Sequence, residues 1–239
     1  MLIAGNWKMF KTPSEATSFC RALRESIGEV GSIDVAVCPP FVSLAGAIEE
    51  LTGSEISVYA QNVHWASNGA FTGEISTAML SELGADGSIV GHSERRQYFG
   101  ETDDTVAKRA KATIDAGMKV IACVGELESE RDANETEAVL ARQLAPIVSE
   151  IGVHERLVIA YEPVWAIGTG KTASPAQAEE AHAFIRSIID VPILYGGSVK
   201  PDNAGELMSQ PNVNGALVGG ASLDVDSFVS LCAAAAVVA

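Results

Sequence analysis

The 239 residues are 47% hydrophobic and 20% charged, which allows a substantial buried core, excludes a mainly disordered chain and fits one α/β barrel in size. The formal net charge of −15 argues against nucleic-acid binding, because a surface that holds backbone phosphates has to be basic. A small phosphorylated substrate is still compatible with this charge, since it responds to local hydrogen-bond donors.

Short β-branched apolar runs alternate with longer amphipathic stretches along the chain. The runs are continuous rather than alternating in polarity, which is typical of parallel strands that helices cover on both faces. The predicted strands are residues 2–6, 33–38, 56–61, 87–91, 118–124, 156–161, 191–195 and 213–218.

Helix-start patterns occupy the intervals between the strands. Thr12-Pro13-Ser14-Glu15 and Ser174-Pro175-Ala176-Gln177 each place a hydroxyl residue before a proline, with Glu or Gln three positions after the hydroxyl. Eight strand–helix units without a linker predict one closed (β/α)8 barrel, a single domain over residues 1–239. An open doubly wound sheet is the alternative, but the G-x-G-x-x-G turn expected after its first strand is absent.

The cysteines and the chain ends indicate a cytoplasmic protein. Cys20, Cys38, Cys123 and Cys232 are far apart and have no histidine at metal-ligand spacing, so we expect reduced thiols and no metal site. Residues 1–6 lack the basic region of a signal peptide, and the apolar run 231–239 is too short to span a bilayer. We therefore expect no membrane segment.

Polar residues follow the predicted strands at the end where a barrel of this kind places its active site. Each of them has a structural explanation on its own: Glu162 could be a salt-bridge partner and His92 a hydrogen-bonded core histidine. A carboxylate, an imidazole and an ammonium on one rim indicate catalysis instead. The residues at these strand ends are Asn6, Lys8, Gln61, Asn62, His92, Glu94, Gly125, Glu126, Glu162, Gly196, Gly197, Ser198, Gly219 and Gly220.

The segment 160–172 places a carboxylate, Glu162, at the end of an apolar strand and directly before a loop. The loop is first apolar (Pro163-Val164-Trp165) and then glycine-rich, and it ends near Lys171. A carboxylate is a weak base in water, so a general base of this type needs a site from which water is excluded. The pattern is that of a base beneath a movable lid, with Lys171 expected to anchor the end of the lid.

Several segments together resemble the triosephosphate isomerase family, in the same order and over most of the chain from Leu2 to about Leu223. The resemblance implies interconversion of dihydroxyacetone phosphate and D-glyceraldehyde 3-phosphate through an enediolate, in glycolysis and gluconeogenesis, with neither a metal nor an organic cofactor. The segments are Ala4-Gly5-Asn6-Trp7-Lys8-Met9, Val90-Gly91-His92-Ser93-Glu94-Arg95-Arg96, Ala160 to Thr172, Tyr195-Gly196-Gly197-Ser198-Val199 and Leu217-Val218-Gly219-Gly220-Ala221-Ser222.

The resemblance also implies the roles of the catalytic residues. Glu162 would move the proton between the two carbons, and His92 would donate to the substrate oxygens. Since His92 precedes a helix start, whose dipole disfavours imidazolium, we expect a neutral ring. Lys8 would bring a cation to the oxyanion, with Asn6 as a neutral donor beside it. Glu94 would be supporting or secondary, by pairing with Lys8.

Phosphate binding is expected from backbone N–H groups at Gly168, Ser198, Gly219 and Gly220, because glycine lets the backbone approach a ligand closely. Closure of the lid would protect the enediolate from losing phosphate. Another phosphate-binding barrel isomerase and a non-catalytic phosphometabolite-binding protein are the alternatives. Both leave the combination of His92, Glu162 and the lid unexplained.

The loop Asn68-Gly69-Ala70-Phe71-Thr72-Gly73-Glu74 resembles the subunit-docking loop of the family, which implies a homodimer with Thr72 near Asn6 and Lys8 of the partner subunit. Two segments and one residue depart from the family pattern. The segment 188–192 is shorter than usual, residues 133–136 replace a common glycine-lysine pair, and Phe10 stands where a polar residue is common. We expect the short segment to affect stability before catalysis, because it lies opposite the active site.

Overall fold

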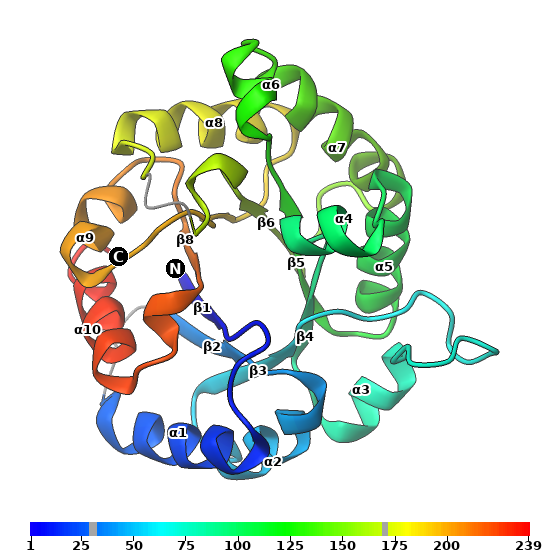
Figure 1. Ribbon diagram of the computed structural model, residues 1–239, viewed down its shortest axis with the longest axis vertical. Coiled ribbons are helices and arrows are strands. Elements are labelled where there is room, and N and C mark those ends of the chain that lie inside the picture. Colours follow the sequence, from blue (N-terminus) through cyan, green and yellow to red (C-terminus); the bar gives the residue numbers. More distant parts are fainter. Residues whose placement is uncertain (29–32, 169–171) are drawn as a thin grey trace.

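Eight parallel strands close into a barrel in which each strand pairs with the next and β8 pairs with β1 (Figure 1). The computed structural model describes residues 1–28, 33–168 and 172–239. The expected lid residues Thr169, Gly170 and Lys171 lie outside them. The strands are β1 (Leu2–Asn6), β2 (Asp34–Cys38), β3 (Ile56–Ala60), β4 (Gly87–Val90), β5 (Lys119–Val124), β6 (Leu157–Tyr161), β7 (Ile193–Tyr195) and β8 (Gly215–Val218).

Helices surround the barrel, as the alternating pattern of the sequence predicts (Figure 1). The helices are α1 (Pro13–Ser26), α2 (Phe41–Leu51), α3 (Thr77–Leu83), α4 (Ser93–Phe99), α5 (Asp103–Asp115), α6 (Glu128–Asp132), α7 (Thr136–Glu150), α8 (Pro175–Ile188), α9 (Pro201–Met208) and α10 (Val225–Ala236). Two short 3-10 helices, η1 (Val164–Ala166) and η2 (Gly220–Ser222), follow β6 and β8.

The predicted helix starts at α1 and α8 are confirmed. At α8, Ser174 Oγ accepts the N–H of Gln177 while Gln177 Oε1 accepts the N–H of Ser174, so both halves of a capping box form. At α1, Glu15 accepts the N–H of Thr12 at 2.8 Å. These caps fix the points at which the two helices begin.

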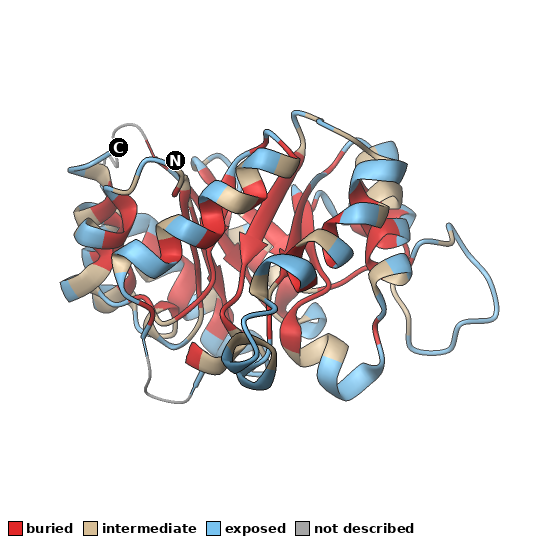
Figure 2. Cartoon of the chain, turned by 90° about the horizontal axis from the view of Figure 1, so that it is seen from above, coloured by how far each residue is buried: buried red, intermediate tan, exposed pale blue. Residues whose placement is uncertain are grey.

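Alternate residues of each strand pack into two different cores, because side chains of a strand point to opposite faces. On β5, Ile121 and Cys123 belong to the core inside the barrel, whereas Val120 and Ala122 pack in the larger core toward the helices. The strands are buried over most of their length, except at first residues such as Asp34 and Lys119, and the outer helix faces are exposed (Figure 2). Being buried on both faces explains why the strands read as continuous apolar runs.

The short segment before β7 lies at the barrel end opposite the active site, as expected. Asp190, Val191 and Pro192 join α8 to β7 and line a cavity of about 700 Å³ together with Met1 and Leu2, at the start of β1. β7 itself is shorter than the predicted run 191–195. Val191 and Pro192, the first two residues of the predicted strand, instead form part of the short connection between α8 and β7.

Candidate active site

A cavity of about 740 Å³ opens at the C-terminal ends of the strands and gathers the residues expected there from sequence. Every residue predicted to be catalytic or to bind phosphate, except Glu94, lines it, although these residues lie at the ends of five different strands. These lining residues are Asn6, Lys8, His92, Glu162, Gly168, Ser198, Gly219 and Gly220. The barrel thus brings residues from both ends of the chain together in one cavity.

Glu162, directly after β6, is 2% exposed, and its two carboxylate oxygens have different surroundings. Its Oε2 accepts the N–H of Ser93 at 2.7 Å, at the start of α4. Its Oε1 lies 2.9 Å from His92 Nε2, within ion-pair distance, and has no aligned hydrogen bond in the described part of the chain. A buried carboxylate with one oxygen left without a hydrogen bond is available to accept a proton.

Burial alone would raise the pKa of Glu162 and lower the pKa of His92, because it disfavours both charges. Burial is the largest single contribution to each pKa, but the contributions that favour the charged forms together outweigh it. His92, aided by the Ser93 N–H and Lys8, holds the pKa of Glu162 below its ordinary value, and Glu162 holds the pKa of His92 above its ordinary value. The expectation of a neutral His92 considered only the start of α4, and the structure adds a carboxylate that acts in the opposite direction.

The His92 ring is oriented by its own helix. Nδ1 accepts the N–H of Glu94 at 3.2 Å, and His92 is the N-cap residue of α4. When the ring is neutral, its proton is therefore on Nε2, the nitrogen that faces Glu162 and the cavity. The arrangement fits a donor directed at the substrate.

Lys8 adopts a left-handed backbone conformation (φ 51°), which is strained for a residue with a side chain. Two contacts fix it: Asn6 Oδ1 accepts the Lys8 N–H at 3.0 Å, and Gln61 Nε2 donates to the Lys8 carbonyl at 2.8 Å. Asn6 was expected to act as a side-chain donor beside Lys8, and here its oxygen accepts from the Lys8 backbone.

The Lys8 ammonium donates to Glu94 Oε1 at 2.6 Å, so the predicted pairing of these two residues is confirmed. The Glu94 side chain is 39% exposed and lies outside the cavity lining. Its contact is with the ammonium of Lys8, which makes Glu94 a residue that holds the cation in place.

Glycines bring the backbone close to the cavity at the expected phosphate end. A Cβ added to Gly219 would lie 3.6 Å from Lys8 Cε, so the lysine stem runs beside the turn after β8. Gly168 has a left-handed conformation (φ 70°), and Ser198 Oγ donates to the Ala166 carbonyl at 3.3 Å. The cation and the glycine turn therefore adjoin the same end of the cavity.

Comparisons with known proteins relate nearly the whole chain to one family. A family model described as Triosephosphate isomerase matches residues 1–235. A curated relative of that name from Solibacter usitatus (strain Ellin6076) is 50% identical over 242 residues, covering 96% of this chain and 97% of the relative. Another, from Carboxydothermus hydrogenoformans, is 51% identical over 243 residues and covers 96% of each chain. The chain belongs to the triosephosphate isomerase family.

No function was assigned to Gln61 and Glu126 from the sequence, although both lie at strand ends near the cavity. Gln61 Nε2 bridges the carbonyls of Lys8 and Cys38, each at 2.8 Å. Glu126 is fully buried and accepts from Tyr161 Oη at 3.1 Å and from Trp165 Nε1 at 2.9 Å, beside η1 at the base of the expected lid. Their positions at strand ends were the available signal, but their partners are fixed only by the fold.

Of the other histidines, His64 and His182 are buried packing residues, and His154 is half-buried. His182 is fully buried against Tyr161 and Tyr195, and burial lowers its pKa to about 4. Residues 1–28, 33–168 and 172–239 contain no cluster of three or more His, Cys, Asp or Glu side chains arranged to hold a metal ion. Within the same residues no helix combines the length and the apolar composition needed to cross a bilayer.

Proposed function

We propose that the cavity interconverts dihydroxyacetone phosphate and D-glyceraldehyde 3-phosphate through an enediolate, with Glu162 as the base. The observation that supports this most strongly is the meeting of Glu162, His92 and Lys8 in one cavity that is lined by glycine turns. Family membership over residues 1–235 supports the same reaction. A larger sugar phosphate or a purely binding role is not favoured, because the relatives carry the triosephosphate isomerase name.

In the proposed reaction, Glu162 takes a proton from one carbon and returns it to the adjacent carbon. To reach both carbons it has to release the Ser93 N–H, which holds Oε2 at 2.7 Å. His92 Nε2 points to the place that the carboxylate then leaves, and there it can donate to the substrate oxygens. Burial raises the pKa of Glu162, so the carboxylate becomes a more effective base once it has left the Ser93 N–H, which lowers that pKa.

The positive charge of Lys8 stabilises the developing oxyanion, and Glu94 holds that charge at the cavity. Phosphate is bound by backbone N–H groups of Gly168, Ser198 and the Gly219–Gly220 turn, which line one end of the cavity. Binding this remote group supplies free energy that positions the reacting carbons.

A coupled assay of D-glyceraldehyde 3-phosphate conversion, without added metal, tests the proposal. Glu162→Gln is expected to lower kcat by about 10²–10⁴-fold, because the amide cannot accept the proton. Glu150→Gln, at the exposed end of α7, is the matched control and is expected to keep full activity. Equal activity of Glu162→Gln and the unchanged protein would exclude Glu162 as the base, and an inactive unchanged protein would exclude the reaction.

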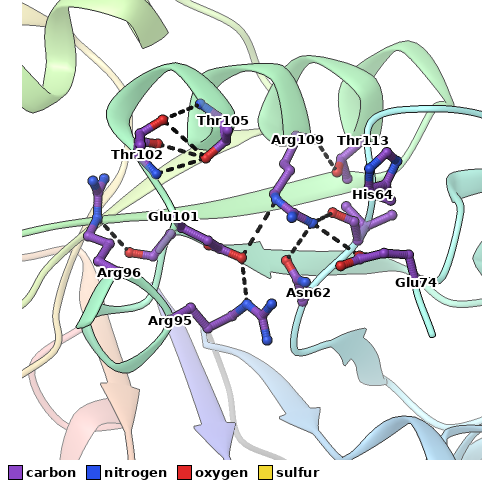
Figure 3. Close-up of polar contacts among 12 residues, drawn as sticks. Asn62, His64, Glu74, Arg95, Arg96, Glu101, Thr102, Thr105, Arg109 and Thr113 are labelled. Atoms are coloured by element: carbon purple, nitrogen blue, oxygen red, sulfur yellow. Dashed lines mark hydrogen bonds and ion pairs between the residues drawn. The ribbon is translucent and has the colours of Figure 1, made fainter. Parts of the chain in front are cut away.

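We further infer a homodimer that docks through the loop between β3 and α3. This loop projects from the barrel and carries the exposed Thr72 (Figures 1 and 2). Arg109 on α5 holds its base: the guanidinium donates to Asn62 and Glu74 (Figure 3). It also donates to the Val63 carbonyl and lies over the Trp65 ring. A projecting loop with a braced base suits insertion into a partner subunit, near Asn6 and Lys8 of the partner subunit.

We also infer that residues 1–239 act as one domain in the cytoplasm. The seam between β1 and β8 supports a single unit, because it joins the first and last strands. All four cysteines are buried and unpaired, which fits a reducing compartment.

A further inference from the structure

Lys11, in the loop between β1 and α1, makes a contact that joins two distant parts of the chain. Its ammonium donates to the Leu223 carbonyl at 2.7 Å, across 212 positions in sequence. Leu223 lines the active-site cavity and is the C-cap residue of η2, the turn that begins at Gly220. The contact therefore connects the first loop to the end of the cavity where phosphate is expected.

The ammonium is held in a fixed position. It lies over the Phe19 ring at 4.3 Å and the Trp7 ring at 5.5 Å, and both rings are buried. The Lys11 backbone is left-handed (φ 70°), and Ser43 Oγ lies 3.5 Å from its carbonyl. A conformation this unusual persists only where the surroundings determine it, so Lys11 is built into the loop and is unlike an ordinary solvated lysine.

The turn that Lys11 contacts is short and connected throughout by hydrogen bonds. The Leu223 N–H donates to the Gly220 carbonyl at 3.1 Å, and Ser222 Oγ donates to the Gly219 carbonyl at 2.7 Å. A displacement of the Leu223 carbonyl would consequently move the backbone of Gly219 and Gly220. Burial lowers the pKa of Lys11, while the charges of Glu15 and Asp224 raise it.

We propose that Lys11 is a positioning residue for substrate phosphate: by holding the Leu223 carbonyl, it fixes the backbone donors of Gly219 and Gly220. Lys11 is absent from the cavity lining, so it acts through the turn and without touching substrate. The inference rests on the proposed function, because it assigns a partner to the phosphate end of that site.

Steady-state kinetics of Lys11→Met and Lys11→Arg test the inference. Lys11→Met is expected to raise both the KM for D-glyceraldehyde 3-phosphate and the inhibition constant of inorganic phosphate by about tenfold, with a smaller change in kcat. Lys11→Arg keeps a cationic donor and is expected to restore most of the loss. Isomerisation of D-glyceraldehyde, which has no phosphate, should proceed equally in all three proteins.

Lys108→Met, on the exposed face of α5, is the matched control and is expected to leave each constant unchanged. Unchanged phosphate inhibition in Lys11→Met would overturn the inference, and so would an equal loss of D-glyceraldehyde turnover, which a general structural role would cause. If Lys11→Met does not fold, Lys11→Gln gives the same comparison. An inactive unchanged protein would instead refute the proposed function.

Discussion

At the scale of single residues, the site is dominated by the contact between Glu162 and His92. Both groups are buried, and the 2.9 Å contact lets each favour the charged form of the other. The start of α4 opposes a proton on Nδ1, because that nitrogen accepts the Glu94 N–H. The charge of His92 therefore depends on where the Glu162 carboxylate is.

Replacing the carboxylate should reveal this dependence. In Glu162→Gln the contributions of Glu162 that raise the pKa of His92 disappear and only the smaller one of Glu94 remains, while burial and the neighbouring Lys8 continue to lower that pKa. The pKa of His92 is therefore expected to fall from above its ordinary value to below it, measured by NMR titration of the ring. His154, which is half-buried and remote in sequence, is the internal reference. A His92 pKa that is equal in both proteins would contradict the proposed pairing.

At the scale of elements, the ends of neighbouring strands approach too closely for ordinary side chains. A Cβ on Gly196, directly after β7, would lie 2.9 Å from Glu162 Cγ and 3.1 Å from the Tyr161 carbonyl. A Cβ on Gly125, after β5, would overlap the Glu162 carbonyl. Glu162 is thus confined between the ends of two strands, and glycine on both sides makes this possible.

Gly196→Ala is expected to displace the Glu162 side chain and lower kcat by about 10–100-fold, since small misplacements of a catalytic group are costly. Gly205→Ala is the control, because a Cβ there meets no atom within 4 Å. Gly205 lies inside α9, where alanine stabilises by about 0.5–1 kcal/mol. Kinetics and thermal unfolding of both variants separate the two effects. Full activity of Gly196→Ala would show that the carboxylate has room to move.

The sequence predicted the strands well because parallel strands buried on both faces leave a continuous apolar pattern. It missed the start of β7, because Val191 and Pro192 are apolar like the strand that follows but belong to the short connection before it. The site residues were predictable from their positions at strand ends. Their partners were not: the Ser93 N–H on Glu162 and the Leu223 carbonyl on Lys11 depend on backbone positions that close only in three dimensions.

At the scale of the whole molecule, the loop between β3 and α3 projects beyond the helices and gives the barrel an asymmetric outline (Figure 2). The Arg109 guanidinium at its base is buried, so the loop is braced before any partner arrives. A preformed loop loses little conformational entropy on docking, which favours stable association.

Sedimentation at micromolar concentration is expected to show twice the 24.9 kDa mass of the chain. Thr72→Arg should shift the protein toward monomers, because it introduces a bulky cation near Lys8 of the partner subunit. Thr52→Arg, at an exposed turn after α2, is expected to leave the mass unchanged. Active monomers alone at this concentration would contradict the proposed dimer.

The pairing of β1 with β8 has a consequence for how the protein is made. Leu2 pairs with Gly215 and Gly5 with Val218. One edge of β1, the first strand to be synthesised, therefore stays uncovered until β8, the last strand, has been made. On a growing chain, β1 is an open edge on which other chains can add strands. Lys8 and the Gly219–Gly220 turn lie on either side of this seam. A nascent chain released before β8 would consequently have Lys8 but no glycine turn beside it, so the proposed site is complete only when the seam closes.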